Sequence, residues 1–428
     1  MRISILGSGY VGLCTGVGFA LKGNEVICLD IDRQKVDAIN SGKAIIEESG
    51  LQEAMGKVGK KLTATTDIAT AVASSSVTFV CVGTPSMEDG GVDTKYLEKA
   101  AEEIGAAIKN IGTFHVVVIK STVPPGIIEE KLAPIIEKSS GKTAGAGFGV
   151  CVNPEFLSEG TALKDFMEPD RIVIGANDKK SGDIVEKLYD DFNAPIVRTD
   201  TKTAEMIKYA SNSFLAAKIT MINEIGNICK KLGIDTYEVA KGVGYDRRIG
   251  NKFLNSGIGF GGSCFSKDVQ ALHNHAKHLG YDPKILYDIL EFNKKQRMKI
   301  IEMLASKLQN LHGKQIAVLG LAFKANTDDI RDSPAIDIIS ELVRKGCSIA
   351  AYDPKARKNF EKIISGIKYT DSTQEAINGA DACVILTDCD EFKNLEEKDF
   401  SSMKSKIIIE GRRILDRNRV KNFDGVCW

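Results

Sequence analysis

The first 200 residues alternate short apolar runs with amphipathic stretches. Runs typical of buried strands occur at residues 2–7, 25–30, 77–83, 115–122, 149–153 and 171–175. Segments with helical spacing lie between them, such as 94–110, and the first helix is expected from about Val11 to Gly23, because glycine commonly ends a helix. Apolar strands that alternate with helices are typical of a parallel sheet covered by helices on both faces.

From Thr201 onward the apolar residues recur at helical spacing for roughly eight turns, without proline and with Gly226 as an internal glycine. This pattern predicts a long helix. Further helices are expected over VQALHNHAKHLG and PKILYDILEFNKKQRMKIIEMLASKL. The region from 200 to 308 is therefore expected to be entirely helical.

The strand pattern returns after residue 312. KQIAVLGLAF…KGCSIAAYDP repeats the order of RISILGSGYV…KGNEVICLDID, which is strand, glycine, helix, Lys-Gly, strand and aspartate. We interpret this as a weak internal duplication. The expected fold is α/β, with two Rossmann-like parallel-sheet domains joined by an all-α central region that contains a long helix. The domains are expected at 1–199, 200–308 and 309–428.

Composition narrows the class of protein. The 428 residues are 43% hydrophobic, and 57 basic residues balance 57 acidic ones, so a basic excess for nucleic acid or a membrane surface is lacking. No apolar run approaches the ~18 residues of a membrane helix. Because the first strand begins almost at Met1, we expect no signal peptide.

The ten cysteines are scattered and include no CxxC pair. Reduced thiols in a cytoplasmic protein are the simplest interpretation. His273, His275 and His278 lack HExxH spacing and a neighbouring cysteine or carboxylate pair, so we expect surface histidines on a helix and no metal site.

The stretch GSGYVG directly follows the first strand and opens a helix. Gly7 permits a tight turn, Gly9 lets the backbone approach a pyrophosphate, and Gly12 allows close packing of helix on strand. Asp30 ends the second strand, where a carboxylate binds a ribose 2′-hydroxyl and favours NAD over NADP. Two basic residues nearby, Arg33 and Lys35, leave NADP as an alternative cofactor. A glycine turn that binds no cofactor is the other alternative.

Two further patterns allow chemistry but do not require it. In GFGGSCFSKD, Cys264 is either a packed thiol in a tight loop or a nucleophile exposed by glycines. Lys208 and Asn212 lie four residues apart and therefore on one face of the long helix. That face either lines a site or is an ordinary solvated surface.

Seven stretches in the same order resemble the UDP-glucose 6-dehydrogenase family, whose wider group includes GDP-mannose and UDP-N-acetylmannosamine dehydrogenases. The resemblance spans nearly the whole chain. The stretches are GSGYVGL, VGTPS, STVPPG, NPEFLSEGTALKDFMEPDRIVIG, KYASNSF, GFGGSCFSKD and GLAFKANTDDIRDSP. The PDRIVIG and FGGSC segments are most similar to the UDP-glucose branch.

The resemblance implies oxidation of UDP-glucose to UDP-glucuronate with two NAD molecules. Cys264 would trap the C6 aldehyde as a thiohemiacetal, which becomes a thioester and is then hydrolysed. Lys208 and Asn212 would hold the oxyanion, and Asp268 would orient or deprotonate water. Glu155 is implied as a base, Glu159 as a neighbour of water and nicotinamide, and Thr122 as a contact of water or the reacting hydroxyl.

The resemblance also implies the remaining contacts. The cofactor-binding residues would be Gly7, Gly9, Tyr10, Val11, Gly12, Asp30, Lys35, Thr84, Thr122, Glu159, Lys267 and Arg331. The substrate-binding residues would be Glu155, Phe156, Leu157, Ser158, Glu159, Lys208, Asn212, Arg248, Phe253, Leu254, Asn255, Ser256, Gly257, Gly261 and Lys324. The three domains would bind NAD, mediate dimerisation and bind the UDP-sugar.

Arg248 resembles an arginine that reaches a neighbouring subunit, so a homodimer or larger homo-oligomer is expected. The chain departs from many relatives at Ser266, where they have proline, and at Asn255, where some have lysine. Three alternatives remain open: a dehydrogenase of GDP-mannose or a UDP-N-acetylhexosamine, a two-electron hydroxyacid dehydrogenase, and a non-catalytic protein that senses NAD or binds a nucleotide sugar.

Overall fold

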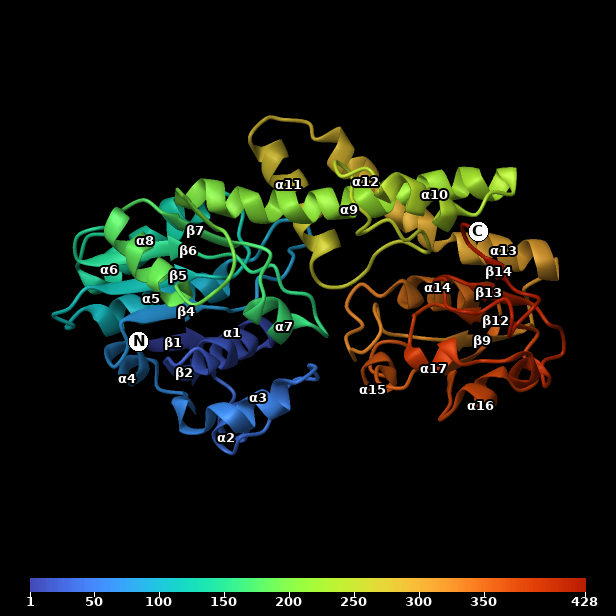
Figure 1. Ribbon diagram of the computed structural model, residues 1–428, viewed down its shortest axis with the longest axis horizontal. Helices are drawn as coiled ribbons and strands as arrows, with labels where there is room; N and C mark the ends of the chain where they lie inside the picture. The colour runs from blue at the N-terminus through green and yellow to red at the C-terminus, as the bar shows by residue number, and fades with distance from the viewer. The chain divides into compact units, whose positions relative to one another are not determined.

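The computed structural model describes residues 1–428 (Figure 1). The chain divides into two compact units, Met1–Ser211 and Asn212–Trp428. No disulfide joins any of the ten cysteines. None of the helices combines the length and apolar character that crossing a membrane requires.

The first unit contains an eight-stranded sheet in the order β3-β2-β1-β4-β5-β6-β7-β8. Its strands are β1 (Arg2–Leu6), β2 (Glu25–Leu29), β3 (Leu62–Thr65), β4 (Val77–Val80), β5 (His115–Ile119), β6 (Phe148–Val152), β7 (Ile172–Ala176) and β8 (Ile196–Thr199). The six strands predicted for this region are all present. The pattern missed β3 and β8, because these short strands at the sheet's two ends keep exposed positions.

Helices cover both faces of this sheet, as predicted. Along β5, Val116 and Val118 belong to one apolar cluster, whereas Val117 and Ile119 belong to another, because successive side chains point to opposite faces. The helical segments are α1 (Tyr10–Leu21), α2 (Arg33–Asn40), α3 (Leu51–Val58), η1 (Gly59–Lys61), α4 (Ile68–Ala73), α5 (Lys95–Ile108), η2 (Ile128–Leu132), α6 (Ala133–Ser140), α7 (Ala162–Met167), α8 (Lys179–Glu186) and η3 (Lys187–Tyr189).

One strand pair departs from the expected parallel arrangement. β7 pairs with β6 in antiparallel fashion, with Val152 opposite Gly175. An antiparallel neighbour begins at the edge where the preceding strand ended, whereas a parallel neighbour needs a crossover. The connection from Asn153 through α7 therefore stays at the carboxyl edge of β6, and this connection contains the NPEFLSEG segment.

The second unit contains a six-stranded sheet in the order β11-β10-β9-β12-β13-β14, with all pairs parallel. Its strands are β9 (Gln315–Leu319), β10 (Ser348–Tyr352), β11 (Lys368–Tyr369), β12 (Ala382–Ile385), β13 (Ile408–Glu410) and β14 (Asp424–Gly425). Its helical segments are α14 (Pro334–Arg344), α15 (Arg357–Phe360), α16 (Thr373–Ile377), α17 (Asp390–Lys393) and η4 (Glu397–Phe400). Six strands of the first sheet follow the same order, which is the Rossmann order and fits the predicted duplication.

Along the chain, only helices and loops occur between β8, the last strand of the first sheet, and β9, the first strand of the second, as predicted. They are α9 (Thr201–Leu232), α10 (Thr236–Gly244), α11 (Phe265–His278), α12 (Lys284–Arg297) and α13 (Lys299–Leu308). The prediction of surface histidines was wrong for His273, which is 7% exposed because α11 packs this face against the ring of Tyr287. No group of three or more His, Cys, Asp or Glu side chains is arranged to hold a metal ion.

Candidate active site

The turn between β1 and α1 explains its three glycines. Gly7 has a φ of +95°, and a Cβ atom there would lie 2.7 Å from the Cys81 carbonyl oxygen. A Cβ atom on Gly12 would lie 1.8 Å from the Gly7 carbonyl oxygen. At Gly9, in contrast, a Cβ atom would meet nothing within 4 Å, and no side chain caps the first turn of α1. The turn therefore presents backbone N–H groups to open space, as a pyrophosphate requires.

Asp30 lies directly after β2 and is held beside this turn. Its Oδ2 accepts a hydrogen bond from the Ser8 N–H at 3.0 Å, and its Oδ1 accepts one from the Asp32 N–H at 3.0 Å. Lys35 places its Nζ 3.7 Å from Oδ2. The carboxylate is thus fixed where a ribose diol would follow the pyrophosphate, so these residues fit an NAD molecule.

The other cofactor candidates of the first unit lie along the carboxyl edge of the sheet. Tyr10 donates its hydroxyl to the Glu47 carbonyl at 3.1 Å. Thr84 and Thr122 follow the neighbouring strands β4 and β5, and both are partly exposed, as is Val11. The Ser121 hydroxyl donates to the Val82 carbonyl at 2.7 Å, which joins the two segments.

Glu155 and Lys208 form a buried ion pair. The distance from Lys208 Nζ to Glu155 Oε1 is 2.9 Å, and the side chains are 4% and 8% exposed, respectively. Burial alone would raise the pKa of Glu155. The Lys208 ammonium, the Leu157 N–H that donates to Oε2 at 2.6 Å, and the charge on Lys120 outweigh this effect and hold the pKa below its ordinary value.

The rest of the segment 156–160 is tied down by its neighbours. The Phe156 ring lies under the Arg171 guanidinium at 3.7 Å, and Leu157 packs at the edge of the apolar core. The Ser158 N–H donates to Asp165 at 2.9 Å. Glu159 is partly buried. The segment thus has a fixed course between β6 and α7.

Sequence reasoning missed Lys120, which directly follows β5 and interacts electrostatically with both Glu155 and Lys208. It is 4% exposed, and its Nζ donates to Asn153 Oδ1 at 2.9 Å. Tyr189 donates to the same oxygen at 2.5 Å. Burial lowers the pKa of Lys120 to about 8. A lysine that directly continues the apolar run HVVVI was the available signal, because lysine is rarely buried without a partner.

In the second unit, the loop before α11 is fixed by α12. The Asn293 amide accepts a hydrogen bond from the Phe260 N–H at 2.8 Å and donates one to the Phe260 carbonyl at 2.9 Å. Arg297 donates to the same carbonyl at 2.7 Å. Gly259 has a φ of +88°, and a Cβ atom there would lie 2.3 Å from Asn293 Oδ1. Glycine is therefore required for this approach.

Cys264 lies at the N-terminus of α11 and is partly buried. Eight of the other cysteines are buried, and Cys81, which is partly exposed, has its pKa raised to about 12 by burial. A helix N-terminus favours a thiolate, whereas an apolar interior opposes it. Of the chain's thiols, Cys264 thus has the surroundings that suit a nucleophile.

Asp268 is one turn along α11 from Cys264 and is 1% exposed. Asn212 donates its amide to Asp268 Oδ2 at 2.6 Å, and Lys267 places its Nζ 2.6 Å from Oδ1. The structure therefore brings together three candidates from α9 and α11, and it pairs Lys267 with a carboxylate.

The substrate and cofactor candidates of the second unit are spread over several loops. Leu254, Ser256 and Gly257 are buried, whereas Phe253 and Asn255 are exposed. A Cβ atom on Gly261 would lie 2.4 Å from the Asp332 carbonyl oxygen. The Arg248 side chain is 89% exposed and pairs with Asp246. Lys324 is partly buried, and Arg331 pairs with Asp329. The roles of all these residues stay predictions.

The sequence matches three family models. They describe the NAD binding domain at residues 1–193, the central domain at 202–295 and the UDP binding domain at 317–417 of one family. The chain belongs to the UDP-glucose/GDP-mannose dehydrogenase family. It is an NAD-dependent dehydrogenase, and the predicted resemblance, cofactor and fold class are confirmed.

Named relatives of the family resemble the chain over at least 96% of its length. UDP-glucose 6-dehydrogenase AglM of Haloferax volcanii is 41% identical, and the matched region covers 100% of this chain and 100% of AglM. UDP-glucose 6-dehydrogenase TuaD of Bacillus subtilis is 43% identical over 96% of this chain and 89% of its own. The solved structure of a UDP-glucose dehydrogenase from Pyrobaculum islandicum has a TM-score of 0.94 and 37% identity, covering 100% of this chain and 98% of that one.

Proposed function

We propose that the protein oxidises the C6 alcohol of UDP-glucose to the carboxylate of UDP-glucuronate, with Cys264 as the nucleophile. The observation that carries this proposal is the partly exposed thiol at the start of α11, one turn from the buried carboxylate of Asp268. A two-electron hydroxyacid dehydrogenase has no use for this pair. The full-length similarity to enzymes named UDP-glucose 6-dehydrogenase supports the choice of sugar.

The first oxidation removes a proton and a hydride from the C6 alcohol. We assign the proton to Glu155 and the stabilisation of the C6 oxygen to the Lys208 ammonium and the Asn212 amide. Thr122 would hold the reacting hydroxyl or a water molecule. NAD⁺ held by the Gly7–Gly12 turn and Asp30 would supply the hydride acceptor, so the two oxidations would use two NAD⁺ molecules in succession.

The second oxidation proceeds on the protein. The Cys264 sulfur bonds to the aldehyde carbon and gives a thiohemiacetal, which loses a hydride from carbon and a proton from oxygen to become a thioester. Water then adds to the thioester carbonyl, with Asp268 accepting its proton and Glu159 nearby. The carbon–sulfur bond breaks, which releases the carboxylate and returns the thiol.

Counting reduced cofactor against consumed sugar tests this proposal. We expect two NADH per UDP-glucose for the purified protein, and loss of turnover with retained UDP-glucose binding for Cys264→Ala. One NADH per sugar, or an active Cys264→Ala variant, would indicate a two-electron dehydrogenase. Binding without turnover would indicate a non-catalytic protein, and faster turnover of GDP-mannose or a UDP-N-acetylhexosamine would reassign the substrate.

Trapping the covalent intermediate tests the role of Asp268. Asp268→Asn keeps the size of the side chain but removes the base, so hydrolysis should become the slow step. Intact mass spectrometry after incubation with UDP-glucose and NAD should then detect the sugar nucleotide bonded to the protein. The adduct should be absent from the Cys264→Ala/Asp268→Asn double variant. If Asp268→Asn turns over at the rate of the wild type without an adduct, Asp268 is not the base.

We also propose that the chain forms a homodimer through α9, in the cytoplasm. Four large apolar side chains of this helix are exposed, with spacings of seven, seven and four residues that place them on one face. They are Phe214, Met221, Ile228 and Leu232, with exposed fractions of 74%, 58%, 56% and 67%. Light scattering should give the dimer mass for the wild type and the monomer mass for Met221→Glu/Ile228→Glu. A monomeric wild type would contradict the proposal.

A further inference from the structure

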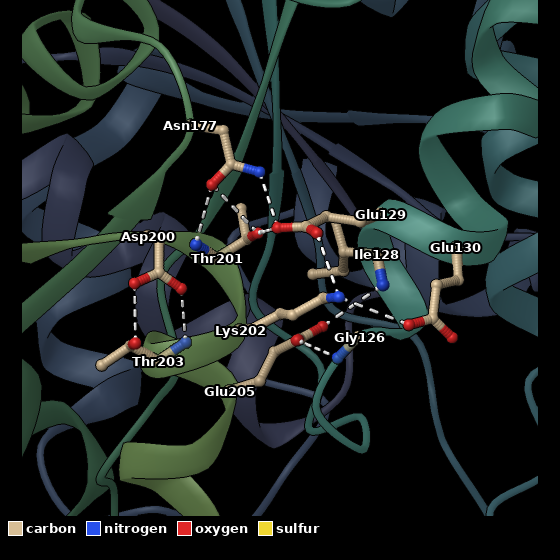
Figure 2. Close-up of polar contacts among 10 residues, drawn as sticks. All are labelled: Gly126, Ile128, Glu129, Glu130, Asn177, Asp200, Thr201, Lys202, Thr203 and Glu205. Carbon is tan, nitrogen blue, oxygen red and sulfur yellow. Dashed lines mark hydrogen bonds and ion pairs between the residues drawn. The ribbon is translucent and has the colours of Figure 1, made fainter.

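Glu205 is a buried carboxylate of the first unit that the proposed reaction does not use. It lies in the second turn of α9 and is 2% exposed. Its Oε2 accepts a hydrogen bond from the Gly126 N–H at 2.6 Å, and its Oε1 accepts one from the Ile128 N–H at 3.3 Å. Figure 2 shows the carboxylate pointing from α9 toward the amides of Gly126, in the loop, and of Ile128, the first residue of η2.

Both ends of this contact are close in sequence to proposed catalytic residues. Gly126 ends the segment STVPPG, four residues after Thr122, and the two prolines between them restrict the backbone. Gly126 itself has a φ of +99°, which glycine adopts most readily. On the other side, Lys208 follows Glu205 by three residues and lies on the same side of α9. The carboxylate thus connects the loop that carries Thr122 with the helix that carries Lys208.

Other contacts already hold the start of α9, so Glu205 is not needed for that purpose. The Asp200 carboxylate accepts a hydrogen bond from the Thr203 N–H at 2.8 Å. Lys202 lies 3.4 Å from both Glu129 and Glu130, at the protein surface. Figure 2 shows these outer contacts around the buried one. What Glu205 adds is a bond to the loop itself.

We propose that Glu205 is a positioning residue, which holds the Thr122–Gly126 loop in register with Lys208 through its bonds to Gly126 and Ile128. The proposal deepens the proposed function and rests on it. A displacement of about 1 Å at a reacting group can lower a rate by about 100-fold, so a short anchor near the site has a large effect.

The charge state of Glu205 provides a signature that a purely structural residue would lack. Burial raises the pKa of Glu205 to about 8, against the opposing effects of the Gly126 and Ile128 amides and of Lys202, while Glu129 adds to the rise. Glu130 faces Lys202 at the surface. The loop contact therefore changes from a neutral carboxyl to a carboxylate as the pH rises through about 8.

The experiment compares the full-length variants Glu205→Ala and Glu205→Gln with the control Glu130→Gln. Glu130 is an exposed carboxylate of the same segment that accepts no hydrogen bond from the Gly126 or Ile128 amide. For Glu205→Ala we expect kcat with UDP-glucose to fall by about 10- to 100-fold with a smaller change in KM. Glu205→Gln keeps one acceptor but cannot ionise. It should therefore recover part of this loss, and any change in kcat near pH 8 that comes from ionisation of Glu205 should be absent from this variant while the part due to Lys120 remains.

Amide hydrogen exchange over residues 121–128 gives a readout that does not depend on turnover. Exchange should be faster in Glu205→Ala than in the wild type and unchanged in Glu130→Gln. The proposal is overturned if Glu205→Ala keeps the wild-type kcat within about twofold, or if exchange of the segment is unchanged. If Glu205→Ala does not fold, Glu205→Gln replaces it: its single acceptor oxygen serves only one of the Gly126 and Ile128 amides, so at least one of the two should exchange faster than in the wild type, and unchanged exchange of both overturns the proposal. A wild type that reduces no NAD with any nucleotide sugar would refute the proposed function, while the exchange result would still show whether the loop is anchored.

Discussion

Asp353 occupies in the second sheet the place that Asp30 occupies in the first. Asp30 follows β2 and accepts a hydrogen bond from the Ser8 N–H, and Asp353 follows β10 and accepts one from the Leu321 N–H at 2.8 Å. Each donor follows a glycine with positive φ, Gly7 or Gly320. The duplicated sequence pattern therefore extends to a specific hydrogen bond within each unit.

Asp30→Ala should weaken NAD binding and reduce the preference for NAD over NADP. The carboxylate would accept hydrogen bonds from a ribose diol and repel a 2′-phosphate. Loss of a hydrogen bond to a charged group corresponds to about a tenfold rise in KM for NAD. Steady-state kinetics with both cofactors measure the effect. Asp37→Ala, an exposed carboxylate on α2, should match the wild type, and an unchanged cofactor preference in Asp30→Ala would contradict this assignment.

Lys208→Met should cost about 3 kcal/mol or more of the free energy of unfolding, because it leaves the Glu155 charge buried without its closest partner. The pKa of Glu155 should rise. The pKa of Glu155 is lower in the folded wild type than in the unfolded chain, so its ionised form stabilises the protein at pH values above the unfolded-state pKa. This stabilisation is lost as the pH falls through the folded-state pKa. Lys208→Met should lack that contribution. Urea unfolding at several pH values measures both effects. The double variant Lys208→Met/Glu155→Gln should regain stability but not activity; additive losses would show that the two residues do not interact.

Asn293→Ala should loosen the loop that precedes Cys264. The substitution leaves the buried Phe260 N–H without its acceptor, at a cost of about 1–3 kcal/mol. We expect a comparable fall in the free energy of unfolding and a fall in kcat of about tenfold, because the thiol is less well placed. Lys294→Ala, next to it on α12 and 70% exposed, is the control. An Asn293→Ala variant as active and as stable as the control would refute the anchoring role.

His115 should make the first unit lose stability in acid. Its side chain contacts the Thr78 hydroxyl at 2.8 Å, and burial lowers its pKa from 6.5 to about 4. Between these values the unfolded chain binds a proton that the folded chain does not, so stability falls as the pH falls. The difference of about 2.5 units corresponds to about 3 kcal/mol. Denaturation at pH 7.5 and 4.5 should show a smaller pH effect for His115→Asn, and an equal effect would assign it to other groups.

The sequence predicted the alternation of strands and helices because each strand is a local apolar run. The antiparallel pairing of β7 was not predictable in this way, since β6 and β7 have the same pattern in either direction. The two-residue strands β11 and β14 were too short to produce a pattern. The second unit repeats the strand order of the first, and only the matching motifs in the two halves of the sequence indicated this repeat.

Candidate site residues were predictable where they lie within a motif, as with Gly7, Asp30 and Cys264. The supporting residues were not, because their partners are distant in sequence. Glu205 bonds to an amide 79 residues earlier, and Asn293 bonds to one 33 residues earlier. A polar residue on a helix face gives no sign of such a partner until the fold is known.

The cysteine thiols differ in their burial, and this difference should allow one of them to be labelled selectively. Burial raises the pKa of Cys28 to about 12 and that of Cys427 to about 11, so both remain protonated in mild buffers. A maleimide dye should therefore attach at Cys264 without removal of the other cysteines. A fluorophore at that position would report directly on ligands that approach the start of α11.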